Sequence, residues 1–424
     1  MLIPFDHIPA GVSFTKALQE LLNTPKASPY GTGLVIDARN LEGEFDLGGF
    51  VCDAYAAHSA PAIIEFGHIR IHLKDWVVFR NFSGAIGMKC IGRSVDGTAG
   101  TNFIWEGPAR ADGLAVDMTK VKTWLDAGAP LGPGQVPTLP TKSPFVFENC
   151  AGPMLENLAL WSDRTHPALA GILCQRADPA PWHQPGANKF SNISVGRLGG
   201  DFPRMFQFGL YLACASGKDW NNSEGDYSRM NLEGATEAAF AIEGGQAKNH
   251  RCHDNCSFNN SKHGIATHTS ANRNGGSFSV RDSNGSYNEI DLYLGSPCDV
   301  INVDGWYGEG SGRLLVTYGG GMNDWAVELS HVTWADNGAA ADGEIVQYTE
   351  RGPFTLRNSA IGYGQNPLRF KLYGNAETTG IAEGNSIGST LVQPFVSETP
   401  LGRWWLRANK VRRGNAFPVF LPDT

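Results

Sequence analysis

A short motif recurs through the last part of the sequence: asparagine, then small or aliphatic residues, with glycine close by. It occurs in LRNSAIGYG (356–364), AEGNSIGST (382–390) and RANKVRRGN (407–415), which places Asn358, Asn385 and Asn409 at spacings of 27 and 24 residues. Ser330 and Ser359 are 29 residues apart in a similar context. Recurrence every ~20–40 residues with variable length is typical of a solenoid, because its loops vary while its strands stay constant.

From residue 145 onward, each repeat pairs a short alternating strand with a second strand that carries the asparagine. Examples of the first strand are GILCQR (171) and GLYLAC (209), and examples of the second are SNISVG and RNSAIG. In a parallel stack, equivalent residues of successive turns lie ~4.8 Å apart, so the asparagines can bond to one another and to the backbone as a ladder at a corner. The pattern predicts an all-β protein, a right-handed, single-stranded parallel β-helix.

The first part of the chain predicts a cap for this solenoid. SFTKALQELLN (13–23) has the apolar spacing of an amphipathic helix, with Ser13 placed to cap its N-terminus. We therefore expect an N-terminal cap over residues 1–48, early turns over 49–144 with a Pro/Gly-rich excursion at 126–144, and regular turns with a C-terminal cap over 145–424.

Composition excludes several classes of function. The net charge is −8, and no Lys/Arg cluster alternates with aromatic residues, so nucleic acid is not expected as a partner. No apolar run is long enough for a membrane span, and no signal peptide is visible. The eight cysteines are thinly spread, and most of them are predicted to be buried. The spacing in HRCHDNC (250–256) is not that of a zinc site, so we expect no metal there.

The opening of the chain resembles that of the pectate-lyase superfamily of right-handed β-helix proteins. The resemblance rests on FTKALQELLN, GTGLVIDARNLEGEF, TNFIWEGPARADGLAV and FVFENCAGPMLENLALW. It implies a helix that caps the first turn, and an activity like that of bacterial polysaccharide lyases and hydrolases or bacteriophage tailspike depolymerases. It also implies an extracellular or virion-surface location and, as in tailspikes, a possible homotrimer.

A solenoid of this kind has no interior cavity, so a binding site must lie on an outer face. We expect an inward row of Ile172, Leu210, Phe240, Ile265, Ile290 and Leu314. Alternation then predicts two outward rows. The first is Leu173, Tyr211, Ala241, Ala266, Asp291 and Leu315. The second is Gln175, Ala213, Glu243, His268, Tyr293, Thr317, Tyr348 and Lys371.

These rows bring four ionisable residues together as a predicted catalytic patch: Glu243, His268, Asp291 and Tyr293. In one mechanism, Glu243 and Asp291 act as the acid and base of an inverting glycosidase, whose carboxyl groups stand ~6.5–9.5 Å apart. In the other, His268 is the base and Tyr293 the acid of a β-elimination on a uronate. Elimination requires a cation beside the uronate, either Arg251 or Arg176, or Ca²⁺ held by Asp219, Glu224 and Asp226.

Aromatic residues in polar loops suggest sugar contacts. Trp220 beside Asp219 is suited to pack on a sugar ring, Tyr211 lies on the first outward row, and Trp182 stands in the loop 176–189. Tyr307 and Glu309 belong to another turn expected to be exposed, GWYGEGSG (305–312).

The sequence therefore predicts a polysaccharide depolymerase without a required cofactor, with Ca²⁺ possible in a lyase. The alternatives are a non-catalytic glycan-binding adhesin or virion structural protein, and a sugar epimerase. Apolar Leu173, Leu315 and Val346 on the outward rows are consistent with lateral association of subunits.

Overall fold

The computed structural model confirms the predicted fold class: the chain is an all-β, right-handed parallel β-solenoid with a helix near its N-terminus. The residues that the structure describes are 2–23, 33–53, 62–92, 100–107, 143–162, 168–175, 186–197, 206–213, 222–242, 247–267, 274–275, 277–294, 296–297, 300–317, 326–373, 378–398, 402–414 and 419–423. The chain divides into two compact units, Met1–Thr236 and Glu237–Thr424, each of which is described by itself.

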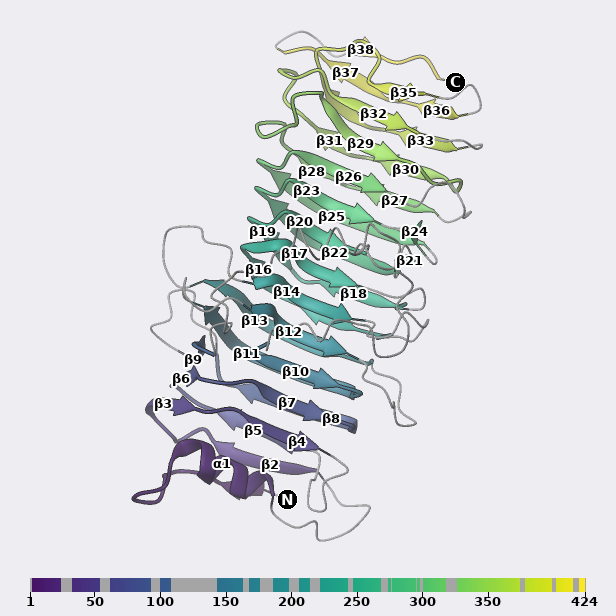
Figure 1. The fold of residues 1–424 in the computed structure, drawn as a ribbon. Helices are drawn as coiled ribbons and strands as arrows, with labels where there is room; N and C mark the ends of the chain where they lie inside the picture. The colour runs from purple at the N-terminus through teal and green to yellow at the C-terminus, as the bar shows by residue number, and fades with distance from the viewer. Residues whose placement is uncertain are drawn as a thin grey trace, which may run out of the picture. The chain divides into compact units, whose positions relative to one another are not determined.

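In the first unit, strands stack in parallel in three columns (Figure 1). The first column contains β1 (Leu2–Pro4), β2 (Leu34–Ala38), β5 (Ala62–Phe66), β8 (Ser83–Cys90), β11 (Ala151–Ser162), β13 (Lys189–Arg197) and β15 (Asp226–Ser228). The second contains β3 (Gly43–Leu47), β6 (Ile69–Leu73), β9 (Thr101–Trp105) and β16 (Asn231–Glu233), and it shares β11 and β13 with the first. The third contains β4 (Phe50–Asp53), β7 (Val77–Arg80), β10 (Phe145–Glu148), β12 (Ala168–Gln175) and β14 (Phe206–Ala213).

The predicted capping helix is present as α1 (Phe14–Leu22), at the N-terminal end of the first unit (Figure 1). The Ser13 side chain accepts a hydrogen bond from the backbone N–H of Lys16 at 3.2 Å, as expected of an N-cap. Phe14 is buried and its ring stacks on Phe5, with centroids 6.0 Å apart. The helix therefore covers apolar residues that the first turn would otherwise leave exposed.

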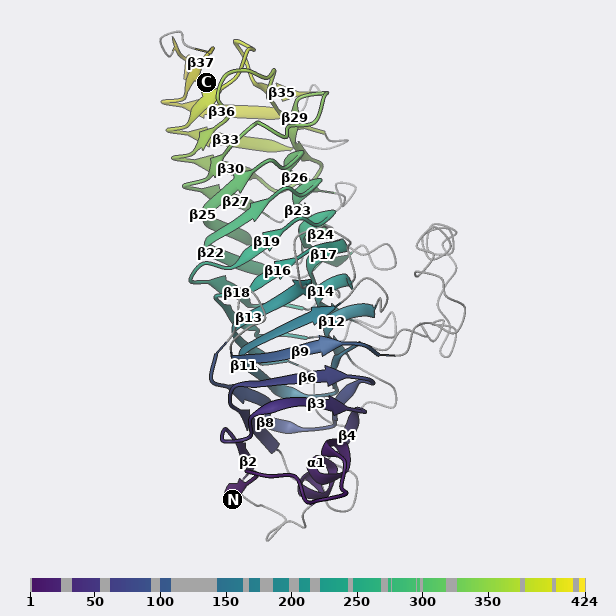
Figure 2. The same cartoon turned by 90° about the vertical axis from the view of Figure 1, so that its left-hand side faces the viewer.

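The second unit has the same three-column arrangement, and we call its three columns sheets I, II and III (Figure 2). Sheet I contains β18 (His250–His253), β22 (Phe278–Ser286), β25 (Ile301–Glu309), β27 (Val327–Ser330), β30 (Phe354–Arg357), β33 (Thr379–Glu383) and β36 (Arg403–Arg407). Sheet II contains the second halves of β22 and β25 with β19 (Ser257–Asn259), β28 (Thr333–Trp334), β31 (Ala360–Ile361), β34 (Ser386–Gly388), β37 (Lys410–Arg412) and the antiparallel β38 (Val419–Phe420). Sheet III contains most of β17 (Ala235–Ile242), with β20 (His263–Ala266), β23 (Ile290–Leu294), β26 (Arg313–Thr317), β29 (Glu344–Tyr348), β32 (Arg369–Leu372) and β35 (Phe395–Ser397). A separate short pair joins β21 (Asn274–Gly275) and β24 (Ser296–Pro297).

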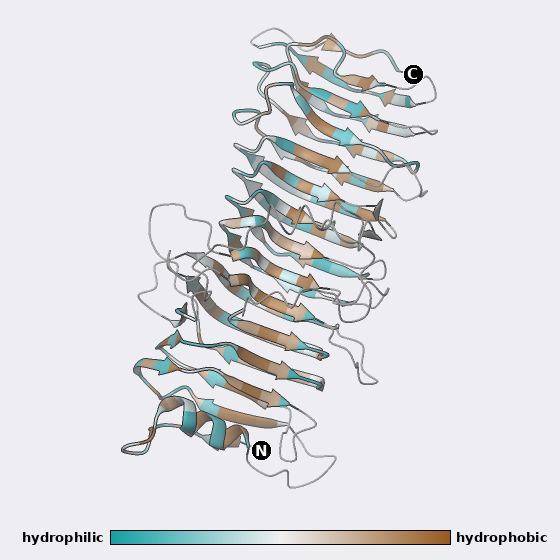
Figure 3. Ribbon diagram, viewed as in Figure 1, coloured by the Kyte–Doolittle hydropathy of each residue, from teal (hydrophilic) through white to brown (hydrophobic). Residues whose placement is uncertain are grey.

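Apolar side chains alternate with polar ones along the strands, so that the apolar ones fill the interior (Figure 3). Stacked aromatic rings occupy the interior of both units. The ring centroids of Phe79 and Phe147 are 5.3 Å apart, and those of Phe258 and Trp306 are 6.1 Å apart. The cysteines of the described residues are buried: Cys52, Cys90, Cys150, Cys174, Cys252 and Cys256. Burial raises the pKa of Cys90 and Cys150 to about 12, so both behave as small apolar residues.

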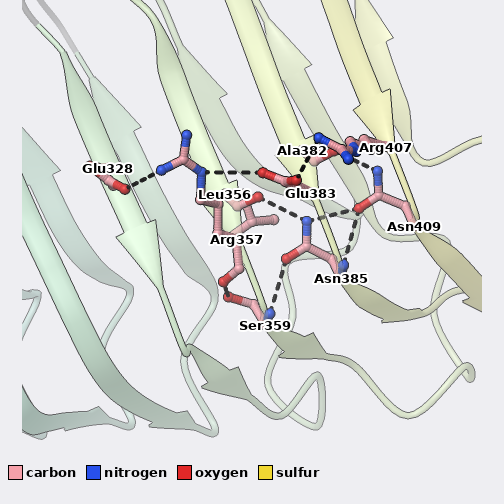
Figure 4. A network of polar contacts seen from close by, with 9 residues as sticks. All are labelled: Glu328, Leu356, Arg357, Ser359, Ala382, Glu383, Asn385, Arg407 and Asn409. Carbon is pink, nitrogen blue, oxygen red and sulfur yellow. Dashed lines mark hydrogen bonds and ion pairs between the residues drawn. The ribbon is translucent and has the colours of Figure 1, made fainter. Parts of the chain in front are cut away.

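The predicted ladder exists in the second unit, one residue along from Asn358. Arg357 pairs with Glu383, which pairs in turn with Arg407, so Ser359, Asn385 and Asn409 share one inward column (Figure 4). Asn385 donates from Nδ2 to Asn409 Oδ1 at 2.9 Å and accepts at Oδ1 from the Ser359 backbone N–H at 3.0 Å. Ser330 pairs with Arg357, so its predicted alignment with Ser359 is wrong.

Asn358 instead belongs to the corner between sheets I and II. One residue per turn adopts a left-handed conformation there, and Asn358 has a φ of 49°. The same corner holds Asp282, Gly305, His331, Gly384 and Ala408, all with positive φ. Asparagine, aspartate and glycine tolerate this conformation best, which explains why the motif places asparagine and glycine next to each other.

Among the described parts of the chain, no helix is both long enough and apolar enough to cross a bilayer.

Candidate functional site

The structure describes only some of the residues predicted to form a site. Glu243, His268, Trp220, Asp219 and Trp182 lie outside the described residues, as do Arg176 and most of the excursion 126–144. Asp291, Tyr293 and Arg251 are described in the second unit, and Tyr211 is described in the first. Of the residues proposed for Ca²⁺, Glu224 and Asp226 are described, and both are exposed.

The predicted outward orientation of Asp291 is wrong, because its carboxyl group is fully buried inside the second unit. The register explains the error: the half-exposed Ile290 pairs with His263 and Arg313, while Leu292 pairs with Ile265 and Leu315. Leu292 therefore takes the place on the inward row that was predicted for Ile290. Asp291 lies between them in the same register, so that two consecutive residues of β23, Asp291 and Leu292, are buried.

Four neutral groups donate hydrogen bonds to the Asp291 carboxylate. Ser311 Oγ and Asn288 Nδ2 reach Oδ1 at 2.6 and 3.0 Å. The indole N–H groups of Trp334 and Trp306 reach Oδ2 at 3.1 and 3.3 Å. Burial raises the pKa of Asp291 to about 6, although all four hydrogen bonds act in the opposite direction. A carboxylate enclosed in this way has no contact with a polymer outside.

The two predicted outward rows also need correction at several other positions. Tyr293 pairs with Ala266 and Val316, and its half-exposed ring stacks on His263 with centroids 4.2 Å apart. The Tyr211 ring stacks on that of Phe208, with centroids 4.3 Å apart. Several residues expected outside are buried: Thr317, Tyr348, Leu173, Leu315 and Val346. The last three can therefore not form an apolar contact surface between subunits.

Arg251 is the predicted site residue that borders a hollow. This depression, with a volume of about 330 Å³, lies on the outer face of sheet I across β18, β22, β25 and β27. Its lining residues are Arg251, Cys252, His253, Ser279, Val280, Arg281, Asn302, Asp304 and Ser330. Because Cys252 and Val280 are buried, the side chains that a ligand meets are mainly the polar ones.

Charges in the hollow are placed by strand register. Arg251, Ser279 and Asn302 share one outward column, and His253, Arg281, Asp304 and Ser330 share the next. His253 Nδ1 lies 3.1 Å from Asp254 Oδ2, and the exposed Arg281 guanidinium lies 4.0 Å from Asp304. Ser330 Oγ donates to Asp304 Oδ1 at 2.9 Å. The hydrogen bond from His331 is the main reason that the pKa of Asp304 is below its usual value.

The second column continues beyond the hollow as alternating charges (Figure 4). Arg357 lies 3.1 Å from Glu328 and 3.7 Å from Glu383, and Arg407 lies 3.5 Å from Glu383. These pairs neutralise one another, whereas the described lining residues of the hollow combine Arg251 and Arg281 with one carboxylate, Asp304.

The first unit carries a second cluster of charges that the sequence reasoning missed. His72 on β6 has Nδ1 2.6 Å from Glu106 Oε1, and its Nε2 contacts Glu44. Burial lowers the pKa of His72, but the hydrogen bonds to Glu106 and Glu44 outweigh it and raise the pKa overall. An imidazolium held between two carboxylates has no nitrogen left to accept a proton, so we assign this cluster a stabilising role.

A signal for the hollow was present in the sequence. HRCHD, SVRDS, NVDGW and ELSHV each place a polar residue just before the residue that turns the corner. Aligning the corner residues rather than the asparagines would have collected His253, Arg281, Asp304 and Ser330 in one column.

Comparison with known proteins adds no family to these observations: no protein-family model matches the chain, and no curated protein shows significant sequence similarity to it.

Proposed function

We propose that this protein binds an acidic polysaccharide on the outer face of sheet I and cleaves it there. The observation that carries the proposal is the hollow in which Arg251 and Arg281 flank polar, uncharged Ser279 and Asn302. Arginine pairs with a carboxylate through two parallel hydrogen bonds, and hydroxyl and amide side chains suit sugar hydroxyls. An acidic sugar brings both kinds of group.

The size of the hollow suits a polymer. Its lining residues come from four consecutive turns, β18, β22, β25 and β27, which corresponds to about 14 Å at the spacing of parallel strands. The outward column of Ser330 continues along the stack through Arg357, Glu383 and Arg407, so a chain of sugars can extend over further turns beyond the hollow.

For cleavage, the described lining residues favour elimination over hydrolysis. Hydrolysis by the usual glycosidase mechanism uses two carboxyl groups, and Asp304 is the one carboxylate that lines the hollow in the described part of the chain. In this proposal His253 acts as the base, and its contact with Asp254, 3.1 Å from Nδ1 to Oδ2, supports that role. It takes the proton from the carbon next to the uronate carboxyl group. The C–O bond to the neighbouring sugar then breaks, a carbon–carbon double bond forms, and water returns a proton to the leaving oxygen.

Three measurements on one panel test this proposal. The protein is mixed with oligogalacturonate and alginate, and binding, the ultraviolet absorbance of unsaturated uronates and new reducing ends are followed. We expect binding and a rise in absorbance. Arg251→Gln with Arg281→Gln should weaken binding strongly, while the control Arg413→Gln, which changes an exposed arginine outside the hollow, should not. Unchanged binding in the double variant would contradict the proposal.

The same panel distinguishes the proposed enzyme from a protein that only binds glycans. A non-catalytic adhesin or virion structural protein would bind through the same arginines but form no unsaturated product and no new reducing ends. Reducing ends without the absorbance would assign hydrolysis. A role on polysaccharide also implies work outside the cell or on a virion surface, and the homotrimer remains a prediction that a measured molar mass can test.

A further inference from the structure

Three tyrosine side chains of the second unit are unusually exposed. Tyr287, Tyr307 and Tyr363 keep 57%, 43% and 62% of their surface in contact with solvent. Aromatic side chains normally bury most of their area, so several exposed rings on neighbouring turns point to a ligand that covers them.

Two of these rings are held by the same turn. Tyr307 lies on the sheet II half of β25, and its hydroxyl donates to Glu309 Oε2 at 2.9 Å. The backbone N–H of Tyr287 donates to the carbonyl oxygen of Glu309 at 2.8 Å. Its ring lies against Gly310, where an added Cβ would come within 2.5 Å of Tyr287 Cδ1. Gly310 thus gives the Tyr287 ring room to lean toward the next turn.

Tyr363 follows β31, farther along the same side of the stack. Its backbone N–H donates to Asp336 Oδ1 at 3.0 Å, and the Gly362 N–H donates to the carbonyl oxygen of Trp334 at 2.8 Å. Gly308, Trp334 and Ile361 pair on successive turns, so Tyr363 lies three turns from Tyr287, or about 14 Å. The pKa of Tyr307 is raised, mainly by its hydrogen bond to Glu309 and further by burial and by the nearby Glu309, Tyr363 and Tyr287. This is consistent with a single cluster of the three tyrosines.

We propose that Tyr287, Tyr307 and Tyr363, the tyrosine platform, bind neutral pyranose rings of a polysaccharide whose acidic sugars occupy the hollow. The apolar face of a sugar ring packs on tyrosine, and its hydroxyl groups can bond to the Tyr307–Glu309 pair. The Glu309 carboxylate would repel a uronate at this position, so the chemistry differs from that of the arginine-lined hollow. This inference rests on the proposed function and adds the composition of the substrate.

One polymer can reach both surfaces. Asp304 faces the hollow on the first half of β25, and Tyr307 faces the platform on its second half. They are three positions apart along the strand, about 10 Å, and the chain turns the corner between them at Gly305. The expected ligand is therefore a heteropolysaccharide that contains both acidic and neutral sugars.

The test measures affinity by titration calorimetry for three probes: hyaluronan oligosaccharides, which alternate acidic and neutral sugars, oligogalacturonates, which are acidic only, and neutral laminarin oligosaccharides. Tyr307→Ala and Tyr363→Ala should each weaken hyaluronan binding by about five- to tenfold and leave oligogalacturonate binding nearly unchanged. Tyr307→Phe, which keeps the ring, should lose less. Val300→Ala changes another exposed side chain and serves as the control.

Each outcome decides between the two ideas. If the alanine variants bind hyaluronan like wild type, or lose affinity for all three probes equally, the proposed tyrosine platform is wrong. Arg251→Gln still tests the hollow separately. Tyrosine-dependent binding of laminarin with no effect of Arg251→Gln on any probe overturns the proposed function and keeps the platform. Wild-type protein that binds none of the probes overturns both.

Discussion

Polar side chains that point into the second unit differ from those that point out of it, even on the same turn. Glu383 is the last residue of β33, and Asn385 lies two residues later, just before β34 (Figure 4). Asn385 is fully buried, and its amide is shared among Leu356, Ser359 and Asn409. The Glu383 carboxylate is 39% exposed between Arg357 and Arg407. The inward contacts are neutral and enclosed, whereas the outward contacts are ionic and open to water.

This difference indicates which groups hold the solenoid together and which are available for function. A buried polar group costs its full desolvation free energy when it loses a partner, about 1–3 kcal/mol, while an exposed ion pair contributes about 0–1 kcal/mol. Inward polar residues should therefore be sensitive to substitution. Outward ones, including those of the hollow, can change to suit a ligand at little cost in stability.

The largest expected effect is that of Asp291→Ala. The substitution leaves Ser311, Asn288 and the indole N–H groups of Trp306 and Trp334 without their acceptor inside the core. We expect a loss of about 4 kcal/mol in the free energy of unfolding of the second unit. Urea unfolding followed by tryptophan fluorescence measures it, since both indoles report directly on the site. A loss below about 1 kcal/mol would show that the interior contacts are not the sensitive ones.

The raised pKa of Asp291 also predicts that the free energy of unfolding depends on pH, and Asp291→Asn should remove this dependence. Its pKa of about 6 in the folded protein is higher than the ordinary value of 3.8, so the folded state binds more protons between these values. Wild-type stability from this group therefore falls as pH rises from about 4 to 6, by about 3 kcal/mol in total. Subtracting the curve of the Asp291→Asn variant, measured by the same unfolding experiment from about pH 4 to 7.5, isolates this contribution. A flat difference would mean that burial does not raise this pKa.

The inward ladder should show the next largest effect. Asn385→Ala removes the acceptor of the Ser359 N–H and the donor to the Leu356 carbonyl oxygen, both buried. We expect a loss of about 2 kcal/mol. Ser386→Ala, one residue along and half-buried on the outer side, is the matched control and should change stability by less than about 0.5 kcal/mol. Equal losses in the two variants would remove the distinction between the sides.

The sequence predicted this inner and outer division in general, but not the register that decides individual residues. The capping helix and the ladder followed from apolar spacing and from the recurring asparagines. The error of one residue at Asn358 arose because asparagine serves equally well in a ladder and in a left-handed corner. The error at Asp291 arose because strict alternation does not foresee two consecutive buried residues, Asp291 and Leu292, in β23. The hollow could not be found from alternation alone, since it needs the register of four strands.

An outward cluster in the first unit allows a test outside the second unit. The pKa of His72 is raised, so its interaction with Glu106 and Glu44 is fully present below about pH 6.5 and is lost as pH rises through the raised value. His72→Asn should therefore destabilise the first unit at pH 6 by about 1 kcal/mol, and by less at pH 9. Thermal unfolding at the two pH values measures the change. A loss that grows with pH would contradict the assignment of His72 as an imidazolium.

The smallest expected effect completes the comparison on a single turn. Glu383→Gln removes the charge that Arg357 and Arg407 share but keeps the shape of the side chain. Because Glu383 is 39% exposed and Arg407 is 78% exposed, water compensates most of the loss, and we expect a change of a few tenths of a kcal/mol that disappears in high salt. The measurement is urea unfolding at low and high salt beside Asn385→Ala. A loss as large as that of Asn385→Ala would mean that outward ion pairs, too, hold successive turns together, and that the hollow could not vary freely in sequence.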